Sequence, residues 1–127
     1  MNLPRYHATE FDLITVCGSM RFYTTMLEVA EKLSVAGYIV LMPFVNTKEG
    51  GYKDNGLVKA ELDKMHFAKI DLSRGIYVVN GTTPDDTAYT GSSTIREIAY
   101  AKRHGKYCRY LVEPLAKENQ VDGLTGV

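Results

Sequence analysis

Four short apolar runs alternate with three segments of helical spacing along this chain, and the alternation limits the fold more than any other feature. The apolar runs cover residues 13–17, 38–42, 76–79 and 107–112. Each run has the length of one buried strand. Strands that alternate with helices form a parallel sheet, and helices then cover both faces of that sheet.

The helical segments are predicted from apolar residues spaced three and four apart. They cover residues 20–36, 57–73 and 93–104. Gly37 and Gly105 follow the first and third segments, where they act as C-terminal stop signals. We therefore expect a single domain over residues 1–127. Its fold should be three-layer α/β, flavodoxin or Rossmann-like, with a mainly parallel sheet of four to five strands.

Charge and composition exclude several classes of partner. The 15 basic and 15 acidic residues give a net charge of zero, without the basic excess of a protein that binds nucleic acid polymers. The apolar runs are far shorter than the ~20 residues of a membrane span. Residues 1–12 are polar, unlike a secretory signal. Cys17 and Cys108 lie in apolar runs, which predicts buried free thiols. We expect a cytoplasmic protein without a membrane or nucleic acid partner.

A candidate anion site follows the first apolar run, since ligands of such sheets bind at the carboxyl ends of the strands. The segment consists of Gly18, Ser19, Met20 and Arg21. A glycine lets the backbone approach a ligand, and a helix N-terminus favours an anion. Ser19 adds a hydroxyl, and Arg21 adds a fork that suits phosphate. In the simpler alternative, Gly18 makes a turn, Ser19 caps the helix and Arg21 is solvated.

A second loop of glycine and hydroxyl residues precedes the third helix. It contains Gly91, Ser92 and Ser93 within residues 89–94. Two such loops at one sheet edge predict a shared cleft for a small anionic ligand. Residues 45–56 form a long loop, of a length often found in functional lids.

Glu97 is the strongest candidate for a catalytic residue. It falls near the first turn of the third helix, where a carboxylate can reach the cleft as nucleophile or base. The helix dipole there should lower its pKa and keep it ionised. The alternative is structural, because Thr94 and Glu97 have the spacing of a capping box.

The second helix offers further polar candidates, Asp63, His66 and Asp71. Asp63 and His66 share a face because they are three residues apart. Asp85 and Asp86 are either solvated or bind sugar hydroxyls. We find no His, Cys and carboxylate cluster with metal-ligand spacing, so we predict neither metal nor cofactor. Five tyrosines are candidates for base stacking or, more simply, for the core or an interface: Tyr23, Tyr52, Tyr77, Tyr89 and Tyr100.

Three segments carry a resemblance to a known family. They are residues 16–21 (VCGSMR), 65–80 and 89–106. Across most of its length the chain resembles the nucleoside 2-deoxyribosyltransferase superfamily. The third segment is the most specific, because the family places its catalytic glutamate in a setting like that of Glu97. The Gly-Ser-x-Arg loop is similar to the branch that hydrolyses 2′-deoxynucleoside 5′-monophosphates as an N-glycosidase.

The resemblance implies an enzyme that cleaves or transfers the N-glycosidic bond of a (deoxy)nucleoside 5′-monophosphate or nucleoside. Glu97 would attack the anomeric carbon and form a glycosyl-enzyme ester, which water hydrolyses or a second base takes over by transfer. Ser19 and Arg21 would hold the 5′-phosphate, helped by Ser92 or Ser93. Related proteins assemble as homodimers or higher homo-oligomers, and we expect the same here.

Two positions depart from the family pattern. The family has an aspartate on the second helix that assists protonation of the leaving base, and His66 or Phe67 stands there in this chain. The proton donor is therefore His66, a shifted aspartate such as Asp71 or Asp63, or absent. Gly91 replaces an aspartate of the transferases. A nucleotide-binding sensor or sequestering protein without turnover stays an alternative, and a phosphoribohydrolase resembling cytokinin-activating enzymes ranks third.

Overall fold

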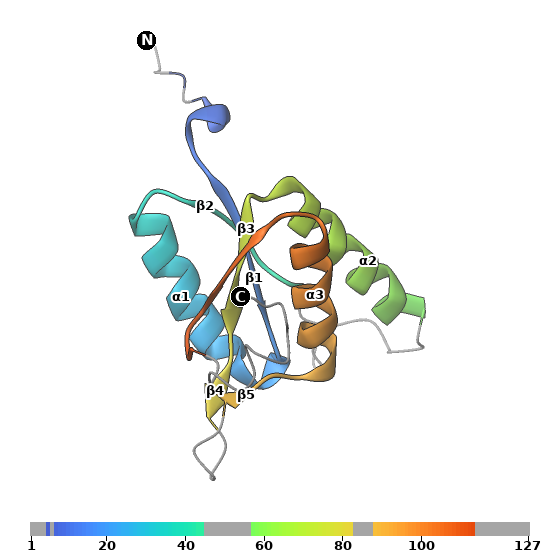
Figure 1. Cartoon of the computed structure of the whole chain (residues 1–127). Helices are drawn as coiled ribbons and strands as arrows, with labels where there is room; N and C mark the ends of the chain where they lie inside the picture. Colours follow the sequence, from blue (N-terminus) through green and yellow to red (C-terminus); the bar gives the residue numbers. More distant parts are fainter. Residues whose placement is uncertain (1–4, 6, 45–56, 83–87, 114–127) are drawn as a thin grey trace.

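The protein forms three layers in the computed structural model, which describes residues 5, 7–44, 57–82 and 88–113. The sheet consists of β1 (Leu13–Gly18), β2 (Ile39–Leu41), β3 (Gly75–Val79) and β6 (Tyr107–Tyr110). All its pairings are parallel, in the order β2-β1-β3-β6. Figure 1 shows α1 (Tyr23–Val35) on one face, and α2 (Leu57–Leu72) and α3 (Ser92–Arg103) on the other. The predicted three-layer parallel fold is confirmed.

The strand order marks one position at the carboxyl edge of the sheet. After β1 the chain crosses to β2 on one side, and it then returns to β3 on the other side. Gly18 at the end of β1 pairs with Val79 at the end of β3. In a doubly wound sheet, ligands bind outside the carboxyl ends of strands where the winding direction reverses. That position lies between β1 and β3.

Two apolar clusters stabilise the sheet from opposite faces. Val16, Val79, Met26 and Val29 form the cluster under α1. Cys17, Ile70, Ile76, Val78 and Ala101 form the cluster under α2 and α3. Because successive strand residues point to opposite faces, the adjacent residues of β1 serve different layers.

Both predicted helix stops are confirmed by backbone geometry. Gly37 has φ +103° and Gly105 has φ +73°, conformations that favour glycine. The amide of Tyr38 donates to the Leu33 carbonyl, and that of Lys106 donates to the Ala101 carbonyl, each at a helix end. These bonds satisfy carbonyl groups that the helices leave open.

The structure corrects several predicted boundaries. The helix expected from residue 20 begins as a 3₁₀ turn, η2 (Met20–Phe22), and another such turn, η1 (Ala8–Glu10), precedes β1. Between the third apolar run and the third helix, where the sequence predicts no strand, β4 (Gly81–Thr82) and β5 (Ala88–Tyr89) form an antiparallel pair. Two-residue strands are too short to show alternation. The predicted loop 45–56 lies outside the described residues.

Both cysteines are free thiols, as predicted, but only Cys17 is fully buried. Cys108 is half-buried because it lies on β6, at the edge of the sheet. Among the helices that the structure describes, none combines the length and apolar character that crossing a membrane requires.

Candidate active site

Three polar side chains from three elements meet on the α2 and α3 side of the sheet. Cys17 is the penultimate residue of β1, His66 lies on α2, and Glu97 lies on α3. Cys17 Sγ is 3.4 Å from His66 Nε2, and His66 Nε2 is 3.8 Å from Glu97 Oε1. One ligand atom from each residue lies within 4.8 Å of the others. We call Cys17, His66 and Glu97 the central cluster.

Helical spacing explains why these polar groups point inward. Glu97 and the buried Ala101 are four residues apart on α3, so they share a face. His66 and the buried Ile70 have the same spacing on α2. The apolar contacts that attach each helix to the sheet therefore also direct its polar group towards Cys17.

Exposure differs within the central cluster. Cys17 is fully buried and His66 is 5% exposed, whereas the side chain of Glu97 is 13% exposed. A small molecule that approaches the cluster therefore meets Glu97 before the other two residues.

Burial dominates the protonation of all three groups. It raises the pKa of Glu97 from 4.5 to about 7, opposed by a hydrogen bond from the Cys17 thiol. Burial lowers the pKa of His66 from 6.5 to about 4, and the Lys69 charge lowers it further. Burial, followed by the negative charge of Glu97, raises the pKa of the Cys17 thiol. At neutral pH the imidazole is uncharged, the thiol is protonated and the carboxyl group is partly ionised.

The prediction that a helix dipole keeps Glu97 ionised is wrong. The N-cap of α3 is Gly91, so Glu97 lies in the second turn, beyond the strongest dipole effect. The capping-box alternative fails for the same reason, because Thr94 lies inside the helix and is 2% exposed. Glu97 therefore faces Cys17 and His66, where desolvation is stronger than the dipole.

The environment of His66 indicates which nitrogen carries its proton. Nδ1 is buried and has no hydrogen-bond partner among the described residues. A proton there would leave a buried donor unsatisfied, at a cost of about 1–3 kcal/mol. Buried donors without a partner are rarer in proteins than buried acceptors without one, so we assign the proton to Nε2, which faces Cys17 Sγ. His66 then donates to the sulfur, and the thiol donates to Glu97.

The first predicted phosphate loop lies at the carboxyl end of β1. A Cβ atom at Gly18 would lie 2.7 Å from the carbonyl oxygen of Val79, so only glycine fits at this strand pairing. Ser19 is the N-cap of η2, and its hydroxyl accepts a hydrogen bond from the Arg21 amide at 3.4 Å. Met20 is 44% exposed, and Arg21 is exposed as well. The capping role expected in the simpler alternative is therefore present.

The second predicted loop leads into α3 at the same edge of the sheet (Figure 1). Gly91 is the N-cap, and its carbonyl accepts the Ile95 amide at 2.9 Å. Ser92 and Ser93 are the first two helical residues. Their amides belong to the first turn, where α-helical N–H groups lack partners within the helix.

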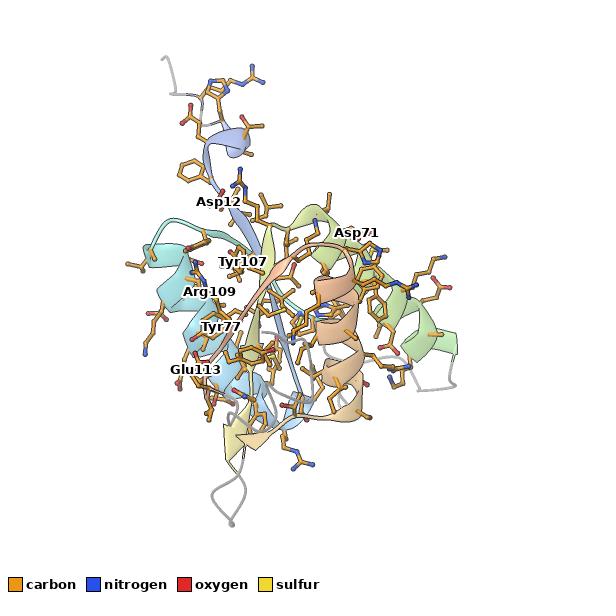
Figure 2. All side chains as sticks on the ribbon, in the orientation of Figure 1. Asp12, Asp71, Tyr77, Tyr107, Arg109 and Glu113 are labelled. Atoms are coloured by element: carbon orange, nitrogen blue, oxygen red, sulfur yellow. The ribbon has the colours of Figure 1, made fainter. Side chains whose placement is uncertain are left out.

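Asp71 does not join the central cluster. It lies in the last turn of α2, and Figure 2 places it at the end opposite β4 and β5. The Tyr100 hydroxyl donates to its carboxylate at 2.9 Å, and Lys106 Nζ donates to its backbone carbonyl. The structure therefore places the Asp71 side chain at the amino edge of the sheet, hydrogen-bonded to Tyr100 and apart from the central cluster.

The remaining candidates have mostly structural surroundings. Asp63 pairs with Lys59 at 2.9 Å and with Arg96 at 4.0 Å, and its charge adds to the rise in the pKa of Glu97. Three tyrosines pack against apolar neighbours, namely Tyr23, Tyr77 and Tyr100. Three of the predicted residues, Tyr52, Asp85 and Asp86, lie outside the described residues, as does the side chain of Tyr89.

Sequence reasoning missed two residues that shape this edge. The apolar run around Cys17 predicts only a buried thiol, whereas its sulfur contacts both His66 and Glu97. Asn80 follows β3 and is 3% exposed. Its Nδ2 donates to the Val112 carbonyl and its Oδ1 accepts the Val112 amide, both at 2.8 Å. A polar residue directly after an apolar run is the signal that points to such a clamp.

Comparisons with known proteins do not indicate a function for this chain. The sequence matches no protein-family model and no curated protein. The resemblance drawn from its motifs therefore stays a prediction.

Proposed function

We propose that the protein cleaves or transfers the N-glycosidic bond of a nucleoside or (deoxy)nucleoside 5′-monophosphate, with Glu97 as the nucleophile. One observation carries the proposal. Glu97 is the most exposed residue of the central cluster, which lies between α3 and the strands β1 and β3. The Cys17 thiol and the His66 imidazole hold it from the buried side.

In the proposed reaction, a carboxylate oxygen of Glu97 attacks the anomeric carbon as the C–N bond breaks. The electron pair of that bond leaves with the base, which takes up a proton from solvent water. Water then attacks the glycosyl-enzyme ester and releases the sugar, or a second base attacks and completes transfer. Both routes regenerate the Glu97 carboxylate.

We assign His66 a positioning role rather than the role of proton donor to the base. Its imidazole is neutral at physiological pH, and a neutral N–H is a weak acid. Its Nε2 faces Cys17 and Glu97. A proton held there fixes the orientation of the thiol and, through it, the carboxylate oxygen that attacks.

A 5′-phosphate would bind between the two loops at the carboxyl edge. Arg21 offers a charged fork, and Ser19 offers a hydroxyl. Gly91 leads into α3, whose first-turn residues, Ser92 and Ser93, supply amide and hydroxyl donors. The substrate would thus extend from the phosphate at this edge to an anomeric carbon next to Glu97.

The test measures free base by chromatography after incubation with ribo- and deoxyribonucleoside 5′-monophosphates and the parent nucleosides, in the presence of a chelator. We expect release from one or a few substrates, and loss of release in Glu97→Gln. Glu28→Gln is the matched control, because Glu28 is an exposed glutamate on α1. Equal rates for Glu97→Gln and the unaltered protein would rule out this nucleophile.

A non-catalytic nucleotide-binding protein is the second candidate. The raised pKa of Glu97 favours it, because a protonated carboxyl group is no nucleophile. Neither Asp63 nor Asp71 supplies an acid to the central cluster. This candidate predicts saturable binding of a nucleotide by calorimetry, without product, and binding that survives Glu97→Gln.

We further propose a cytoplasmic homodimer or higher homo-oligomer. The supporting observation is three exposed apolar side chains on α2 and α3, namely Met65 (56%), Leu72 (71%) and Ile95 (55%). Sedimentation equilibrium tests this assembly, and a monomer at all concentrations would contradict it.

A further inference from the structure

We propose that the central cluster binds a divalent transition-metal ion of the zinc type, and that this ion inhibits the reaction at Glu97. The inhibition rests on the proposed function, whereas the metal binding does not. The three residues offer sulfur, nitrogen and oxygen, which together are the ligand atoms that proteins use for zinc.

The distances within the cluster suit a tetrahedral ion. With bonds of about 2.3 Å to sulfur and 2.1 Å to nitrogen or oxygen, tetrahedral geometry separates neighbouring ligand atoms by about 3.4–3.6 Å. The Cys17 sulfur is 3.4 Å from His66 Nε2, which is 3.8 Å from Glu97 Oε1. The Cys17 sulfur and the Glu97 oxygen lie within 4.8 Å of each other, so an ion requires side-chain movements of up to about 1 Å to bring all three ligand atoms to tetrahedral spacing.

The type of ligand selects among metals. Thiolate and imidazole suit Zn²⁺ and Co²⁺, whereas Mg²⁺ and Ca²⁺ require oxygen ligands. Three protein ligands leave a fourth tetrahedral position, as in open zinc sites. Glu97 is the partly exposed ligand, and so it marks the side from which an ion enters.

The surroundings of His66 indicate reversible binding. Coordination through Nε2 moves the imidazole proton to Nδ1, which lacks a partner among the described residues. Zinc ligands of high affinity have that second nitrogen hydrogen-bonded. Coordination also releases the Cys17 proton to solvent. Both costs place the affinity below that of a structural zinc site, so an ion can come and go while the fold persists.

A bound ion should block the proposed reaction because it occupies the lone pair of the Glu97 oxygen. The Glu97 oxygen that would attack a sugar donates its pair to the ion instead. Bound metal should therefore prevent formation of the glycosyl-enzyme ester, and a chelator should restore base release.

The test titrates the chelator-treated, full-length protein with Co²⁺ alone and follows the thiolate-to-cobalt charge-transfer absorption. We expect one ion per chain, an absorption band that Zn²⁺ removes and Mg²⁺ does not, and no band in Cys17→Ser. Cys108→Ser is the matched control and should keep the band, since Cys108 lies on β6 outside the cluster. Circular dichroism establishes that each variant is folded.

Three outcomes would overturn the metal site: no band in the folded unaltered protein, an equal band in Cys17→Ser, or loss of the band in folded Cys108→Ser. If Cys17→Ser does not fold, Glu97→Gln decides, and an unchanged Co²⁺ affinity contradicts the site. Base release is measured separately with chelator. Failure of metal binding is thus distinct from failure of the proposed reaction.

Discussion

Replacing Glu97 by glutamine should stabilise the fold at high pH. The folded protein holds the Glu97 pKa at about 7, against an ordinary value of 4.5 in the unfolded chain. A pKa raised on folding contributes stability at low pH that is lost as pH rises. The two values differ by about 2.5, and each unit corresponds to about 1.36 kcal/mol. Ionising the buried carboxyl group thus costs up to about 3 kcal/mol above pH 7.

The assay is urea unfolding of the unaltered protein and Glu97→Gln at pH 5 and pH 9, with chelator present. Between these values the difference in unfolding free energy should shift by about 2.5 kcal/mol in favour of Glu97→Gln. The lowered pKa of His66 has the opposite sign, since its contribution is present above 6.5 and lost towards about 4. Both proteins retain His66, and the causes of its shift do not include Glu97, so the His66 contribution cancels in the difference.

The control is Glu28→Gln, which removes an exposed carboxylate on α1 and leaves the central cluster unchanged. A constant difference for Glu97→Gln across the same range would refute the reasoning, because it would mean that folding does not desolvate this carboxyl group.

Three further predictions concern activity and the carboxyl edge. Base release, measured as kcat/KM with chelator, should rise about tenfold per pH unit below about 7 and level off above it, as Glu97 ionises; a rate independent of pH would contradict the nucleophile. Gly18→Ala should destabilise the protein by about 1–3 kcal/mol in urea, because a Cβ would lie 2.7 Å from a carbonyl of the next strand; unchanged stability would contradict that close approach. Asn80→Ala should destabilise by a similar ~1–3 kcal/mol, since it leaves the Val112 amide and carbonyl unpaired, and thermal unfolding that matches the unaltered protein would show that water replaces the clamp.

The layers of the fold were predictable because apolar periodicity reports burial directly. The four runs and three helical segments correspond to β1, β2, β3, β6 and the three helices. Gly37 and Gly105 mark helix ends because only glycine adopts a positive φ without strain. The short β4 and β5 pair escaped prediction, since its strands have two residues each.

The site was predictable in part. Glu97 and His66 were identified, but Cys17 was not, because a continuous apolar run does not reveal which face each residue occupies. Asp71 lies apart from the cluster because five residues on a helix correspond to a rotation of about 140° from His66. The direction of the shift in the Glu97 pKa depends on how deeply the carboxyl group is buried and on the residue at which α3 begins. A sequence predicts neither the burial nor the first helical residue closely enough to decide that direction.

The two apolar clusters on opposite faces have a consequence for how this protein tolerates mutation. Val16 and Cys17 are neighbours in sequence, yet one packs under α1 and the other belongs to the central cluster. The sheet therefore separates the central cluster from the α1 layer. Substitutions at Val16, Met26 or Val29 should change stability and leave the central cluster in place, whereas repacking α2 or α3 moves one of its titratable groups.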